Sequence, residues 1–482
     1  MTRHPTHAAI AAHRFGPGEP GLDAIAGDPK GWLLAQQGPA DVQRGNGLVS
    51  GAQGIRHYAE FLARQRQPET AAAAASAVAA AAAAPLRAVV QADVRARLAT
   101  AATSTRPFAE RLALFWANHF TVSLAKNGVR GAVGAFEREA IRPHTAGRFE
   151  TLLQAAVTHA AMLRYLDNDL SAGADSPLVR RQAARPRAPG QPGPRITGLN
   201  ENLAREVLEL HTLGANSGNA GAEGSGAVYG GWGGYTQADV TAFAAVLTGW
   251  RIPVRELLQG GEVAASRFEP AWHQPGPKTV LGKTYPEGPD ALAAVLHDLA
   301  RHPSTARFVC TKLARHFVAD TPPPALVARL EASWRDSDGD LAAVSRSLVL
   351  APEAWQPQPV KLKTPEEFVI SSVRLLGLGE TAFSRVPDGG IGALGQRVQA
   401  APSPAGWPDR AEEWLGPDAV WKRVEWATRV ADRMGRQTDA RALAAASLGA
   451  LLQEDTARQI ARAADGPQAL ALLLLAPEFQ RR

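Results

Sequence analysis

Apolar residues recur at three- and four-residue intervals along most of the chain, which is the spacing of amphipathic helices. Between 106 and 120 this stripe consists of Phe108, Leu112, Phe115, Trp116 and Phe120. The same spacing predicts helices over 55–65, 69–83, 85–101, 133–141, 148–159 and 160–165, and again from 289 to 482. The chain is therefore predicted to be mainly α, with many helices packed orthogonally or as a bundle.

Three stretches interrupt the helical spacing. Residues 171–198 and 214–234 are rich in Gly and carry little periodicity, and the first is also rich in Pro and Arg, so we expect two flexible loops there. Residues 251–285 contain short strand-like runs separated by turn residues, which predict a small β-hairpin. Thr236, with Asp239 three residues later, has the pattern of a capping box at the start of a helix.

Charge and cysteine content exclude several classes of protein. The 482 residues carry a net charge of +6 with no run of Lys and Arg, which argues against a nucleic-acid partner. Cys310 is the only cysteine, so the chain has neither an internal disulfide nor a cysteine-based metal site. The helical pattern around Cys310 predicts a buried core thiol.

The sequence also bears on location. No window of 18 apolar residues is free of charge, so we expect no membrane span. The first 21 residues lack the apolar core of a secretory signal peptide, so we expect a cytoplasmic protein.

The densest group of polar residues within a helical pattern lies in the segment 200–214, NENLAREVLELHTLG. If this helix is regular, Asn202, Arg205 and Glu209 share one face, and Glu206 lies one turn before Glu209. Two carboxylates together with His211 suit either acid–base chemistry or a divalent metal ion. The spacing nevertheless matches neither the zinc-protease nor the di-iron signature.

A structural interpretation of the same segment stays open. Arg205 could bridge Glu201 and Glu209 in a buried network, while His211 is favoured at the negative end of the helix dipole. The segment then fixes helix packing and carries no chemistry.

Other polar residues stand at helix ends and in loops. Asn118 and His119 end the helix 106–120, while Arg142 and His144 flank a proline that ends another helix. His273 and Lys278 lie in a rigid Pro- and Gly-rich loop, where we expect both to be exposed. We interpret three further histidines on or beside amphipathic helices as structural: His297, His302 and His316. No Gly-x-Ser-x-Gly elbow is present to anchor a serine triad.

Ten of these segments, in order, resemble the bacterial family catalogued as domain of unknown function 1800. They are residues 13–18, 111–123, 136–169, 200–214, 233–250, 273–282, 302–320, 363–377, 403–409 and 473–482. The resemblance implies a single helical module over 1–482, in which 171–198 is an internal loop. It also implies a partner from a second family, domain of unknown function 1501, which looks like the sulfatase superfamily.

The chain departs from this resemblance in two places. Many members of the family are exported, which makes a periplasmic location the alternative to a cytoplasmic one, yet no signal peptide is visible here. The Gly-rich segment 214–234 is also longer than the connection usual in the family. We interpret this segment as a flexible loop or a lid, and its extra length argues against a lid role for residues 216–230 that the whole family shares.

Two hypotheses follow. In the first, the protein is an enzyme acting on an anionic or polymeric substrate, and Glu206, Glu209, His211 and His119 are its catalytic residues or metal ligands. The substrate-binding residues would be Asn118, Arg142, His144, Asn200, Asn202, Arg205, Tyr235, His273 and Lys278. In the second, the protein is a non-catalytic assembly or export companion of the sulfatase-like partner.

Overall fold

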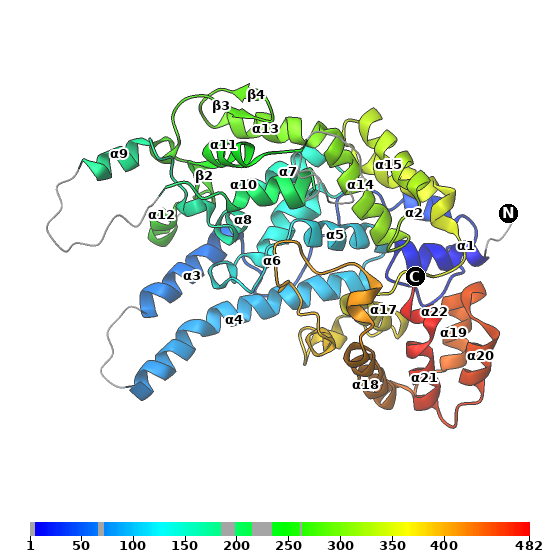
Figure 1. Cartoon of the computed structure of the whole chain (residues 1–482). Coiled ribbons are helices and arrows are strands. Elements are labelled where there is room, and N and C mark those ends of the chain that lie inside the picture. Colours follow the sequence, from blue (N-terminus) through cyan, green and yellow to red (C-terminus); the bar gives the residue numbers. More distant parts are fainter. Residues whose placement is uncertain (1–4, 66–71, 185–197, 215–233, 261–262) are drawn as a thin grey trace.

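The computed structural model describes residues 5–65, 72–184, 198–214, 234–260 and 263–482, and helices dominate it, as predicted (Figure 1). The helices of the first half are α1 (Pro5–Ile10), α2 (Pro29–Leu34), α3 (Gly51–Gln65), α4 (Ala72–Thr103), α5 (Pro107–His119), α6 (Val133–Phe136), α7 (Phe149–Thr158), α8 (Ala160–Tyr165), α9 (Pro177–Ala183), α10 (Asn202–Glu206) and α11 (Gln237–Leu247). Those of the second half are α12 (Val254–Gln259), α13 (Asp290–Arg301), α14 (Pro303–Phe317), α15 (Pro324–Asp336), α16 (Leu341–Leu350), α17 (Pro365–Leu375), α18 (Pro417–Met434), α19 (Ala440–Leu448), α20 (Glu454–Ala461), α21 (Gly466–Leu475) and α22 (Pro477–Gln480).

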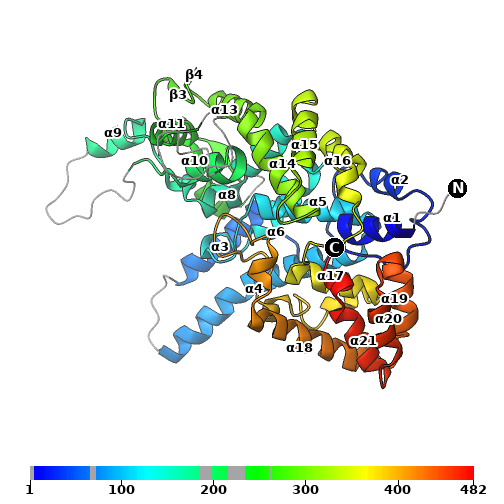
Figure 2. The same cartoon turned by 45° about the vertical axis from the view of Figure 1, so that its right-hand side comes forward.

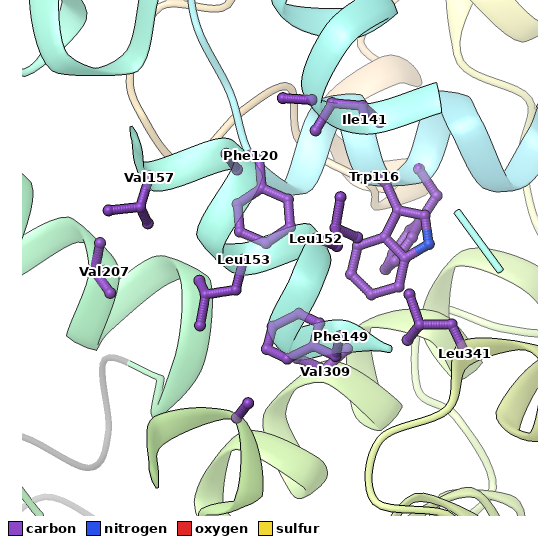
Figure 3. Close-up of a cluster of buried hydrophobic side chains, with 14 of the residues drawn as sticks. Trp116, Phe120, Ile141, Phe149, Leu152, Leu153, Val157, Val207, Val309 and Leu341 are labelled. Atoms are coloured by element: carbon purple, nitrogen blue, oxygen red, sulfur yellow. The ribbon is translucent and has the colours of Figure 1, made fainter. Parts of the chain in front are cut away.

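The larger hydrophobic core surrounds α5 and α7 and is rich in aromatic rings. Figure 3 shows Trp116, Phe120 and Phe149 gathered in it, and the Phe120 and Phe149 rings lie 6.1 Å apart. Cys310 is fully buried in the same core, as predicted from its helical surroundings. The apolar stripe of 106–120 therefore forms the centre of the protein.

A second hydrophobic core joins α17, α18 and α21 to the C-terminal half of α4. Helices α17–α22 gather at one side of the molecule in both views (Figures 1 and 2), and α5 lies between α14 and α17. Helix α5 is thus the element shared by the two halves of the candidate site described below.

Two antiparallel strand pairs occupy the region predicted to hold a β-hairpin. β1 (Trp250–Arg251) pairs with β2 (Arg267–Phe268), and β3 (Lys278–Val280) forms a tight hairpin with β4 (Lys283–Tyr285), in which Thr279 faces Thr284. The prediction is confirmed, with two pairs in place of one. The capping box is confirmed too, since Thr236 and Asp239 exchange their hydrogen bonds.

The structure corrects two boundaries. The predicted helices 69–83 and 85–101 form a single helix, α4, with Pro85 inside it. Pro85 is exposed, so water can replace the hydrogen bond that its missing N–H removes, and the Ala-rich flanks have high helix propensity. The predicted loop 171–198 contains helix α9, while 185–197 and 215–233 lie outside the described residues. None of the described helices is long and apolar enough to cross a membrane.

Candidate functional site

The segment 200–214 forms a helix that changes type in its middle. Helix α10 ends at Glu206 and continues as a π-helix, η6 (Val207–Thr212), in which the N–H of Leu213 donates to the carbonyl of Leu208. A π turn holds more residues than an α turn, so it rotates the following side chains relative to a regular helix. As a result His211 is fully buried, while Glu206 and Glu209 stay partly exposed.

The two carboxylates face tyrosines instead of the imidazole. Burial and the neighbouring Glu209 raise the pKa of Glu206. Burial and the charge of Glu209, which also accepts a hydrogen bond from the phenol, raise the pKa of Tyr235 to about 12. Burial and Glu206 similarly raise the pKa of Tyr165 to about 12. Glu206 and Glu209 are therefore a half-buried acidic pair near two tyrosines, one of which, Tyr235, is hydrogen-bonded to Glu209.

The polar residues at the start of this segment are satisfied locally. Arg205 lies 3.3 Å from the carboxylate of Glu201 and donates to Gln237 at 3.0 Å, both near the surface. Asn200 accepts the N–H of Asn202 at 2.9 Å, which supports the first turn of the helix. The structural interpretation predicted the Arg205–Glu201 contact, although it placed the network in the interior.

His119 and His211 form a buried pair in the larger core. The Nε2 atom of His119 lies 3.1 Å from the carbonyl of His211, and the two rings are 6.2 Å apart. Among the described residues, Nδ1 of His119 and both ring nitrogens of His211 have no hydrogen-bond partner. Burial and the nearby Lys312 lower the pKa of His211 to about 3, so its imidazole is neutral at pH 7. The four residues predicted as catalytic or metal-binding therefore divide between two places.

Arg142 is not available for a substrate, contrary to our expectation. Its guanidinium is buried and pairs with the carboxylate of Glu110 and, at 3.2 Å, with that of Glu137. Arg97 pairs with Glu137 as well and bridges to Glu366 at 2.8 Å. Desolvating a cation is costly unless carboxylates pair with it, and here Arg97 and Arg142 are paired with Glu110, Glu137 and Glu366.

His144, next to this network, is only partly buried, and desolvation lowers its pKa. It lies beyond Pro143 in a 3-10 turn, η4 (Arg142–His144). Of the predicted site residues, Arg142 is the one that shares this turn with His144.

His273 and Lys278 bind each other. Nζ of Lys278 lies 2.9 Å from Nε2 of His273, whose Nδ1 lies 2.7 Å from the carbonyl of Thr248. We expected both side chains to be exposed, but they are 3% and 6% exposed. The pair ties the β3–β4 hairpin to the end of α11, which is a structural role.

The structure places a cavity of about 340 Å³ elsewhere, between the end of α5, helix α14, the start of α17 and the segment 396–413. We call it the α14 cleft. Of the predicted site residues, only Asn118 and His119 line it. Asn118 exchanges two hydrogen bonds with the main chain of Trp407, at 2.9 and 2.8 Å, and so holds the opposite wall in place.

An Asp–His pair lies in the wall of the α14 cleft. Nδ1 of His316 is 3.1 Å from Oδ2 of Asp409, whose Oδ1 lies 3.0 Å from the ammonium of the buried Lys361. Burial lowers the pKa of His316 against the opposing effect of Asp409. Burial alone would raise the pKa of Asp409, but His316 and Lys361 depress it well below its usual range. The imidazole is therefore neutral beside an ionised carboxylate.

A second carboxylate lies on the other side of the imidazole. Oε1 of Glu367 is 4.0 Å from Nε2 of His316, which is too long for a hydrogen bond. Glu367 pairs with Arg111 and, at 2.8 Å, with Arg482. Burial would raise its pKa, but these arginines lower the pKa of Glu367 to about 2. Nε2 of His316 thus keeps its lone pair unpartnered within the described structure.

Lys312 lies one helical turn before His316 on α14 and lines the same cleft. Within the described parts of the chain its ammonium forms no ion pair or hydrogen bond, and it lies 5.4 Å from the centre of the Phe308 ring. Burial lowers its pKa to about 8. A cation that faces a cavity without a carboxylate partner is suited to binding an anion.

Reasoning from the sequence alone missed Lys312, His316, Glu367 and Asp409. His316 was interpreted as structural because it lies on an amphipathic helical pattern. One signal could have found them, since five of the ten motifs supply residues to the α14 cleft: 111–123, 136–169, 302–320, 363–377 and 403–409.

The predicted metal site gains no support from the geometry. Among the residues that the structure describes, no three His, Cys, Asp or Glu side chains come together in a way that could hold a metal ion.

A family model described as "Protein of unknown function (DUF1800)" matches residues 11–481. No curated protein and no solved structure matches the chain. The matched range contains every residue of the α14 cleft together with the segment 200–214. The protein therefore belongs to the DUF1800 family.

Proposed function

We propose that the protein is an enzyme that carries out acid–base chemistry on an anionic substrate in the α14 cleft. One observation carries the proposal: Asp409 orients His316 through Nδ1, while the unpaired Lys312 reaches the same cavity from one turn away. Perturbed titratable groups that meet in a cleft are more common at functional sites than elsewhere.

Each residue has a distinct role in this proposal. Asp409 accepts a hydrogen bond from the N–H at Nδ1 and so holds the imidazole in the tautomer whose Nε2 lone pair is free. His316 then takes a proton from the attacking group, which is general-base catalysis. Lys312 binds the anionic group of the substrate. Asn118 positions the wall that carries Trp407.

The reaction class can be tested with three chromogenic esters: a phosphate monoester, a sulfate ester and a carboxylate ester of nitrophenol. We expect turnover of at least one ester, and we expect His316→Gln to lower kcat by about 100-fold or more. Lys312→Met should act mainly through a higher KM for the phosphate or sulfate ester. Lys422→Met, a change at an exposed surface pair on α18, is the matched control. If no ester is hydrolysed, or if His316→Gln keeps the rate of the unchanged protein, the hydrolytic proposal fails.

The alternative is a non-catalytic assembly protein that binds a sulfatase-like partner of the domain of unknown function 1501 family. The observation in its favour is that Nε2 of His316 is shielded from solvent and that Glu367, beneath the cleft, is already held by Arg111 and Arg482. Co-expression and co-purification of the two chains would test it. Failure of the two chains to associate, measured by size-exclusion chromatography, would remove this alternative.

A further inference from the structure

A second cavity, of about 440 Å³, lies between α17, α18 and the 3-10 segment η10 (Gly379–Phe383). We call it the α18 cavity. Its walls are largely apolar and include Val373, Leu376, Val430 and Met434 together with the ring of Trp426. The indole N–H of Trp426 already donates to the carbonyl of Gly389 at 3.0 Å. Trp426 therefore offers the cavity an apolar ring surface.

Three arginines surround the mouth of the α18 cavity: Arg385, Arg429 and Arg433. All three are exposed, and within the described residues none of their guanidinium groups forms an ion pair or hydrogen bond. Arg429 and Arg433 are one turn apart on α18, so their side chains leave the helix in the same direction.

The carboxylates near these arginines in the sequence form no ion pair with them. Asp388 accepts the N–H groups of Gly390 and Gly392, at 3.0 and 2.9 Å, and so closes its own turn. Glu425 and Asp432 share α18 with the arginines, but neither forms an ion pair with them. The mouth therefore presents exposed guanidinium groups that form no ion pair within the described residues, above an apolar interior.

We infer that the α18 cavity binds a small amphiphile, an alkyl chain that ends in a carboxylate. The chain would fill the apolar interior, and the carboxylate would pair with Arg429 and Arg433, because guanidinium groups match carboxylates with two parallel hydrogen bonds. The cavity volume is within the range of about 300–1,000 Å³ typical of small-molecule sites.

The α18 cavity is separate from the α14 cleft. Glu366 and Glu367, at the start of α17, line the cleft, whereas Ser372, Val373 and Leu376 near the end of that helix line the cavity. The inference therefore stands independently of the proposed enzyme activity.

Isothermal titration calorimetry of the full chain with dodecanoate, kept below its critical micelle concentration, tests the inference. We expect saturable binding of one dodecanoate per chain. Acetate, which lacks the chain, and dodecyltrimethylammonium, which carries the opposite charge, should each bind at least about tenfold more weakly. The double variant Arg429→Gln/Arg433→Gln should weaken dodecanoate binding by at least about tenfold. Arg462→Gln, a change at an exposed arginine after α20, should leave the affinity unchanged.

The variants change exposed side chains, so a circular dichroism spectrum equal to that of the unchanged protein will show that they fold. Three results would each overturn the inference. They are the absence of saturable dodecanoate binding, equal affinity of the double variant, and equal binding of the cationic amphiphile.

Discussion

Oδ2 of Asp409 lies 3.1 Å from Nδ1 of His316, although the two residues are 93 positions apart in the sequence. Asp409 follows the segment 403–408, whose Trp407 is fixed by Asn118 at the end of α5. Helix α14 supplies His316, so this contact exists only when α5, α14 and the segment 403–409 are packed together. The relationship can be tested directly by the titration of the imidazole.

Replacing Asp409 should change that titration. Asp409 raises the pKa of His316 against the effect of burial, so Asp409→Asn should lower the pKa of His316 further. Nitrogen-15 NMR of the imidazoles as a function of pH measures this shift. Asp418→Asn, at an exposed ion pair on α18, should leave the His316 titration unchanged. An unchanged or raised pKa in Asp409→Asn would show that the 3.1 Å contact does not control the imidazole.

Stability should fall as the pH drops below about 6.5. Burial lowers the pKa of His13 and of His211 to about 3, so between pH 6.5 and 3 the unfolded chain binds more protons than the folded one. Each histidine then lowers the free energy of unfolding by up to about 1.4 kcal/mol per pH unit as the pH falls through this window. Above the window it has no effect on the free energy of unfolding. Asp93 opposes this trend below pH 6, because burial raises its pKa to about 6.

The variant His211→Leu removes one of these two titrating side chains. Denaturant unfolding at pH 7.5, 6.5 and 5.5 should give a pH slope smaller by up to about 1.4 kcal/mol per unit than in the unchanged protein. At pH 7.5 the substitution should be neutral or stabilising, since both ring nitrogens of His211 lack a partner within the described structure. The same pH slope in both proteins would contradict the buried neutral imidazole.

Removing the buried cation of Arg142 should be far more damaging than removing an exposed one. The Arg142 and Glu110 side chains are 3% and 1% exposed, so Arg142→Met leaves uncompensated carboxylates in the core and should cost about 3–5 kcal/mol. Arg148→Met removes an ion pair whose side chains are 54% and 50% exposed, and should cost about 0–1 kcal/mol. Urea unfolding of both variants measures the difference. Equal losses would show that the network around Arg142 is not desolvated.

Gly54 allows α3 to contact the segment before α6 directly. A Cβ atom at Gly54 would lie 1.8 Å from the carbonyl oxygen of Gly131, so Gly54→Ala must push the two backbones apart. We expect a loss of about 1–3 kcal/mol of stability. Gly27→Ala is the control, because a Cβ there meets nothing within 4 Å, and thermal unfolding of the two variants compares them. A stability for Gly54→Ala equal to that of the control would contradict the close approach.

Several features of the fold follow from local sequence. The apolar stripe of α5, the hairpin around 278–285 and the burial of Cys310 were all predicted and are confirmed. The reason is that periodicity, turn residues and caps act over a few residues, so the sequence near each element carries the information. The helix propensity of the Ala-rich residues on either side of Pro85 was underestimated. They continue the helix through the proline, so that Pro85 lies inside α4.

The candidate site was harder to predict. The polar segment 200–214 suggested a single face on a regular helix, but the π-helix η6 turns His211 into the core and leaves Glu206 and Glu209 beside Tyr235. A helical wheel assumes the same rotation at every residue. The sequence gives no local sign of where a turn takes in an extra residue and becomes a π-helix.

The sequence by itself determined the helical class, the order of the elements and the family. Only the tertiary structure decided which charged groups face a cavity. From the sequence, Arg142 and Lys312 look equally able to bind an anionic ligand. In the structure two carboxylates pair with Arg142, whereas none pairs with Lys312 within the described residues. Charge neutralisation acts between side chains that meet through space, so the availability of Lys312 and His316 depends on how α5, α14, α17 and the segment 396–413 pack.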